Sequence, residues 1–127
     1  KKYNIKIVES KDGIIWNREG KIAIDYNSND EFAFSVPRII NEDSIYKMWF
    51  SYRSFKNDGT YRIGYAESLN AYDWERLDNL VGISVSHNGW DSQMICYPYI
   101  FDYNNEKYML YNGNNYGQTG FGIAKLT

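Results

Sequence analysis

The fold is decided by the stretch Ile63-Gly64-Tyr65-Ala66-Glu67-Ser68, because the chain contains two counterparts of it at one fixed spacing. One counterpart is Ile5–Ser10 and the other is Gly122–Leu126. Positions 9, 67 and 125 share one slot, so that 67 − 9 and 125 − 67 both equal 58. A period of this length indicates a supersecondary unit that is used repeatedly and cannot bury its apolar face alone. Since the chain opens inside a unit, we expect it to be a piece of a larger repeat protein.

The composition favours a folded sheet protein. Of the 127 residues 43 % are apolar, and the net charge is −2, which suggests neither intrinsic disorder nor a nucleic-acid partner. Aromatic residues make up 18 % of the chain, led by 13 Tyr and 4 Trp, an enrichment typical of strands. The single cysteine, Cys96, excludes an internal disulfide framework.

The sequence carries no membrane or targeting signal. No run approaches the ~18 apolar residues that span a bilayer, so we expect no membrane partner. No positively charged and then apolar segment opens the chain. Because we expect a piece of a longer protein, the compartment stays undetermined.

The residues around the repeated stretch predict a unit of four strands. The first complete unit starts near Glu31, and its strands are expected at 32–40, 45–52, 61–68 and around 74–76, separated by turn residues at 41–44 and 56–59. The next unit repeats this order with strands at 94–101, 107–112 and 120–126. Pro37 matches Pro98 at a spacing of 61, and Lys47 is matched to Lys107 at a spacing of 60.

Antiparallel four-stranded units in radial repetition are the plan of a β-propeller, and the predicted fold class is therefore all-β with propeller blades. A β-sandwich also has many short strands, but it gives no reason for the self-match. We expect one propeller fragment over 1–127: the end of one blade in 1–30, a complete blade in 31–78 and most of a following blade in 79–127. Other blades of the same protein, or self-association, would have to cover the outer faces.

The same residues carry a resemblance to a known family. The runs Pro37–Ile40, Tyr46–Ser51 and Arg62–Ser68 resemble a blade of the five-bladed propeller glycoside hydrolases, families 43, 32 and 130 among them. Gly89–Ser92 and Lys107–Gly113 are similar to the closing blades of such proteins, so the sequence is matched to about two C-terminal blades. The resemblance covers nearly the whole chain and is more specific for the fold than for an activity.

The resemblance implies glycosidic-bond cleavage by paired carboxylates on the innermost strands, just before a proline. Here Val36 precedes Pro37 and Tyr97 precedes Pro98, so neither blade offers Asp or Glu in that slot. The main catalytic carboxylates are therefore expected outside this chain.

Two residues of one loop are the local candidates for catalysis. Asp91 lies in Gly89-Trp90-Asp91-Ser92, a turn that leads into an inner strand, although an Asp there also serves to cap the turn. His87, the single histidine, could tune a proton transfer, or it could simply be solvated.

Five residues are candidates for substrate binding. Arg38 and Arg53 could grip a carboxylate or a pair of sugar hydroxyls, or form surface salt bridges. Trp90 and Tyr97 could stack on a sugar face, or belong to the core. Asn112 could bind a sugar hydroxyl, or serve a turn.

The sequence thus predicts a carbohydrate-active propeller related to glycoside hydrolases, with carbohydrate as its partner. The alternative is a non-catalytic, lectin-like glycan-binding or assembly propeller. No phosphate-binding glycine loop and no metal-ligand spacing occur, so we expect no cofactor and no metal.

Overall fold

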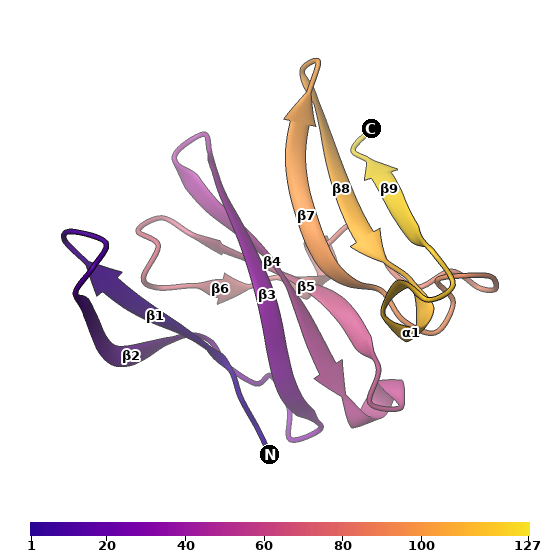
Figure 1. Ribbon diagram of the computed structural model, residues 1–127, viewed down its shortest axis with the longest axis horizontal. Helices are drawn as coiled ribbons and strands as arrows, with labels where there is room; N and C mark the ends of the chain where they lie inside the picture. The colour runs from indigo at the N-terminus through magenta and orange to yellow at the C-terminus, as the bar shows by residue number, and fades with distance from the viewer.

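The computed structural model describes residues 1–127 as three antiparallel sheets that lie side by side (Figure 1). The first sheet consists of β1 (Ile5–Ser10) and β2 (Trp16–Ile24). The middle sheet consists of β3 (Glu31–Glu42), β4 (Ile45–Ser54), β5 (Tyr61–Ser68) and β6 (Glu75–Arg76). The last sheet consists of β7 (Cys96–Tyr103), β8 (Glu106–Asn112) and β9 (Phe121–Lys125).

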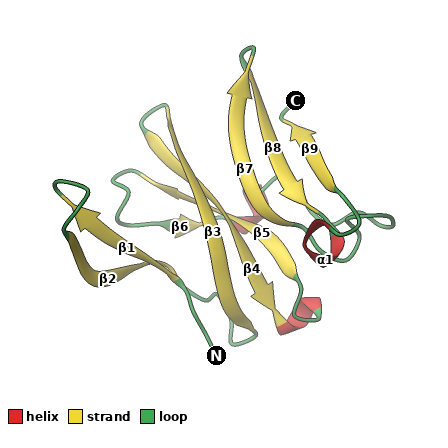
Figure 2. Cartoon of the chain, in the orientation of Figure 1, coloured by secondary structure: helices red, strands yellow, loops and turns green.

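Helical structure is confined to three short turns (Figure 2), which are η1 (Phe55–Asn57), η2 (Asp78–Leu80) and α1 (Asn114–Gly117). In each sheet the strands pair in the order in which they occur along the chain. The structure therefore confirms the predicted all-β fold with antiparallel, blade-like sheets. No helix has the length and apolarity needed to cross a membrane.

Before β1, Tyr3 forms a parallel bridge with Ala33 of β3 through backbone hydrogen bonds with Phe32 and Phe34. One predicted strand limit needs correction. The strand predicted to start at Met94 starts at Cys96.

The register of the hairpins corrects the predicted match between Lys47 and Lys107. Lys47 pairs with Glu67, and the residue in the same place of the last sheet is Tyr108, which pairs with Lys125. The spacing between the second strands is therefore 61, the same as between the two prolines. A slip of one residue reverses the face on which every side chain of a strand lies, so the spacing of 60 assigned β8 residues to the wrong face.

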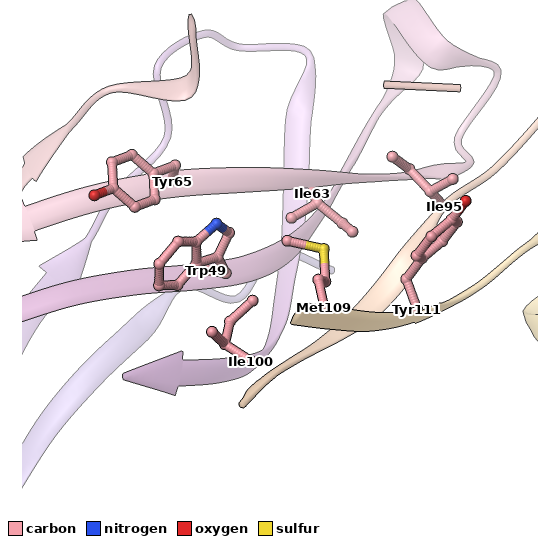
Figure 3. Packing of buried hydrophobic residues seen from close by; sticks show 7 residues of the cluster. All are labelled: Trp49, Ile63, Tyr65, Ile95, Ile100, Met109 and Tyr111. Carbon is pink, nitrogen blue, oxygen red and sulfur yellow. The ribbon is translucent and has the colours of Figure 1, made fainter. Parts of the chain in front are cut away.

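The middle sheet has a hydrophobic core on each side. The core between the middle and last sheets (Figure 3) consists of Trp49, Ile63, Tyr65, Ile95, Ile100, Met109 and Tyr111. The core between the first and middle sheets consists of Ala23, Ile24, Phe34, Met48, Phe50 and Ala66. Successive residues of a strand point to opposite faces, so β4 supplies Trp49 to one core and both Met48 and Phe50 to the other. The two cores, one on each face of the middle sheet, hold the three sheets side by side as neighbouring blades.

Candidate functional site

The first strands of the middle and last sheets share a bulge at their pre-proline residues. The pairing of β3 with β4 shifts between Ser35 and Arg38, and that of β7 with β8 shifts between Cys96 and Tyr99. Val36 has φ 49° and Tyr97 has φ 58°, values that β-branched and bulky residues rarely adopt. Bulges re-aim side chains and collect near functional sites, so this end of the strands is the place to search for a site.

Four tyrosines gather at that end, and we call Tyr3, Tyr61, Tyr97 and Tyr116 the tyrosine cluster. The ring of Tyr61 lies 5.7 Å from that of Tyr97 and 6.0 Å from that of Tyr116, measured between centroids. Tyr97 and Tyr116 stack at 6.3 Å. Tyr61 is buried beneath the others, whereas the Tyr3 and Tyr116 side chains are about half exposed. The cluster therefore presents aromatic faces on a fixed base.

Burial keeps the hydroxyls of Tyr97 and Tyr3 protonated at neutral pH. Burial, followed by the neighbouring Tyr61, raises the pKa of Tyr97 to about 12. The same two causes raise the pKa of Tyr3. Ser35 donates a hydrogen bond of 3.4 Å to the Tyr61 hydroxyl. Hydroxyl groups thus lie together beside apolar ring faces, a combination that suits ligands with alternating C–H and O–H surfaces.

The loop between β8 and β9 holds Tyr116 in place. Asn115 and Tyr116 both have left-handed backbone angles, with φ 51° and 61°. Asn114 fixes this loop to the segment before β7, because its side-chain oxygen accepts hydrogen bonds from the backbone of Gln93 and Met94 at 2.8 and 3.0 Å. Asn112 donates a hydrogen bond of 3.3 Å to the Tyr116 carbonyl. The exposed ring of Tyr116 is therefore carried by a strained but well-anchored turn.

Trp90 packs inside this region. Its ring stacks on Tyr111 at 5.5 Å. A Cβ added at Gly113 or Gly122 would lie 2.5 Å from Trp90 atoms, so the indole fills the space that these glycines leave. In this position the ring supports the loop that carries Tyr116.

Neither of the two candidates for catalysis forms a hydrogen bond with the tyrosine cluster. Asp91 is buried, and its carboxylate accepts a hydrogen bond of 2.9 Å from the Tyr111 hydroxyl. Burial, followed by this contact with Asp91, raises the pKa of Tyr111 to about 12. His87 lies exposed in the connection between β6 and β7, with no side-chain hydrogen bond. A catalytic role for either residue stays a prediction.

The two arginine candidates occupy different places. Arg38 lies between β3 and β7, with its guanidinium carbon 4.3 Å above the Tyr99 ring and a hydrogen bond of 3.3 Å to the Ile100 carbonyl. Arg53 lies beside the tyrosine cluster, 5.6 Å from the Tyr61 ring centroid.

Of the seven predicted site residues, the structure brings Tyr97, Arg53 and Asn112 to the tyrosine cluster. Sequence reasoning missed Tyr61 and Tyr116. Tyr61 opens a strand, where an aromatic residue indicates core, and Tyr116 follows two asparagines in a segment typical of a turn. The signal that could have found both is their shared position in the repeat, since each follows a second strand that pairs with a bulged first strand.

A concave region lies away from this end of the strands. It is an apolar cleft of about 130 Å³ between the middle and last sheets, lined among others by Trp49, Ile100 and Met109, with Lys107 and Lys125 at its edge. Its lining contains no carboxylate and no histidine, so it offers no acid or base for catalysis.

The sequence is similar to two curated proteins of Mycobacterium tuberculosis. These are the uncharacterized proteins Rv1502 and MT1551, from two strains, each 39 % identical over 122 residues. The match covers 96 % of this chain and 40 % of each relative, so the chain spans less than half the length of the curated relatives it matches. No family model matches the sequence.

Two solved structures share the fold. One is a glycoside hydrolase, with a TM-score of 0.70 and 21 % identity over 96 % of this chain and 35 % of its own. The other is a BT0996–RGII complex, with a TM-score of 0.69 and 20 % identity over 98 % of this chain and 36 % of its own. At these identities the likeness establishes the arrangement of the sheets.

Proposed function

We propose that this chain forms part of a five-bladed propeller that recognises carbohydrate through the tyrosine cluster. The observation that carries the proposal is the tyrosine cluster at the bulged ends of β3 and β7, in which the half-exposed Tyr3 and Tyr116 lie over the buried Tyr61. Sugars offer C–H faces for stacking and hydroxyls for hydrogen bonds, which matches both properties of the cluster. The fold shared with a glycoside hydrolase supports the proposal.

Saccharide binding by variants of the cluster tests this proposal. We expect Tyr116→Ala to weaken binding about fivefold to tenfold, because it removes a stacking face that the core does not need. Tyr103→Ala is the matched control, since Tyr103 is exposed at the opposite end of β7 and should leave binding unchanged. The measurement is isothermal titration calorimetry of the intact protein with a panel of neutral and acidic oligosaccharides. Equal binding by both variants and the wild type would remove the cluster from the proposal.

The intact protein is either a glycosidase or a binding protein. The pre-proline slots hold Val36 and Tyr97, and Asp91 is engaged with Tyr111, a combination that favours a non-catalytic blade pair. In the glycosidase alternative the carboxylates come from elsewhere in the propeller. Turnover of aryl glycosides by the intact protein decides between the two, and loss of turnover in Asp91→Asn with an unchanged fold would assign Asp91 to the reaction.

A further inference from the structure

We propose that the carbohydrate is acidic and that Arg53 binds its anionic group, either a uronate carboxylate or a sulfate ester. This inference rests on the proposed carbohydrate-binding function. It is carried by the way in which the structure holds the Arg53 guanidinium beside the tyrosine cluster without an anionic partner.

The Arg53 side chain is fixed in one orientation. Its Nε donates a hydrogen bond of 2.6 Å to the Gly59 carbonyl. Its guanidinium carbon lies 5.1 Å from the Phe32 ring centroid and 5.6 Å from that of Tyr61, within the range of cation–π attraction. Phe32 in turn stacks on the exposed ring of Phe55 at 4.6 Å. The guanidinium is therefore held before any ligand arrives, which lowers the entropy cost of binding.

The charge of Arg53 is not neutralised by the protein. The nearby Asp30 forms an ion pair with Lys56, and no Asp or Glu forms one with Arg53. Arg76 shows the opposite case, since its guanidinium forms two hydrogen bonds of 2.7 Å with the buried Glu31 carboxylate. The planar fork of arginine suits carboxylates and other oxyanions. Glu31 already binds the guanidinium of Arg76, whereas that of Arg53 can still bind an oxyanion.

The surroundings of Arg53 match an anionic sugar. Arg53 lies close enough to Tyr3 that its charge opposes the rise in the pKa of that hydroxyl. The Tyr3 hydroxyl beside the guanidinium can donate a hydrogen bond to the same anion, while the exposed rings take the sugar face. Arg38 also forms no ion pair, but its guanidinium lies over Tyr99 and bonds to the Ile100 carbonyl, and neither residue belongs to the tyrosine cluster.

The test compares three trisaccharides by titration calorimetry of the intact protein. They are a hexuronic acid trisaccharide, its carboxyl-reduced neutral counterpart and the same neutral trisaccharide carrying sulfate esters. We expect the wild type to bind an acidic form at least tenfold more tightly than the neutral one, and to lose this preference as salt is raised. The acidic form that binds more tightly identifies the anionic group. This comparison needs no variant and so does not depend on how a variant folds.

Variants then assign the preference to Arg53. Arg53→Met should bring acidic and neutral affinities to within about twofold while neutral binding remains, and Arg53→Lys should keep part of the preference. Arg18→Met, which removes an arginine of β2 that forms no ion pair, should keep all of it. Equal wild-type affinity for acidic and neutral forms would overturn the acidic ligand and leave carbohydrate binding standing. Binding of no saccharide at all would overturn both proposals.

Discussion

The carboxylate of Asp91 accepts a hydrogen bond from Tyr111 in a place from which water is excluded. Removing one partner of a buried hydrogen bond costs more than the bond contributes, because the other partner is left without water or protein to bond to. The same carboxylate is also the candidate for a catalytic acid or base. A pair of substitutions at this residue separates the two roles.

We expect Asp91→Ala to lower the free energy of unfolding by about 1–3 kcal/mol, since it leaves the Tyr111 hydroxyl unpaired. Asp91→Asn keeps an oxygen that can accept the bond and should cost clearly less. Urea unfolding followed by tryptophan fluorescence measures both values. Tyr111→Phe serves as the control, because in its background Asp91→Ala should cost less than it does in the wild type. Equal stability of Asp91→Ala and the wild type would contradict a structural role for this hydrogen bond.

At the level of elements, the repeat in the sequence predicted the strands well because strand length and turn chemistry are local properties. The register was harder, since matching Lys47 to Lys107 looks natural in the sequence while the structure matches Lys47 to Tyr108. Both first strands carry the same bulge at the residues before their proline, so the spacing of 61 between the prolines also holds for the second strands, and the spacing of 60 between the lysines does not. The tyrosine cluster depends on contacts between different sheets, and such contacts have no signature in a single strand.

The hairpins β3–β4 and β7–β8 are joined by a charged group at their tips. Glu42 forms ion pairs with Lys47 at 2.5 Å and with Lys107 at 2.9 Å, and Lys107 also pairs with Asp102 at 2.8 Å. Hydrogen bonds from Lys47 and Lys107 lower the pKa of Glu42 below its usual value. A carboxyl whose pKa is lowered on folding stabilises the protein above its unfolded pKa of 4.5, and this contribution is lost as the pH falls further.

We therefore expect Glu42→Gln to lower the free energy of unfolding at pH 7 by up to about 1 kcal/mol, because the pair is partly exposed and screened. At a pH below the lowered pKa, the variant and the wild type should become equally stable. Glu75→Gln is the matched control, because Glu75 is an exposed residue of β6 without an ion pair. Urea unfolding at a series of pH values from 7 downward measures the difference, and a difference that does not shrink as the pH falls below 4.5 would contradict the ion-pair explanation.

For the whole molecule, the equivalence of the two larger sheets predicts that the outer face of the last sheet is covered by another sheet. The middle sheet directs Trp49 and Tyr65 toward the last sheet, where they are buried. Their counterparts by register are Leu110 and Ile123, which point away from the core on the far side of the last sheet. Phe121 and Ile123 on β9 are 75 % and 63 % exposed. This face has the composition of a covered one, so we expect it to bind another sheet.

We therefore expect the 127-residue chain alone to self-associate. The double variant Phe121→Lys and Ile123→Lys should associate less, because lysine on an edge strand opposes sheet pairing and removes apolar surface. Leu69→Lys is the control, since Leu69 is 81 % exposed outside the strands and its change should leave association unaltered. Sedimentation velocity over a range of concentrations measures the association. A wild-type chain that stays monomeric throughout that range would show that this face needs no cover, and an equal effect of the control would mean that added charge alone, at any surface position, is the cause.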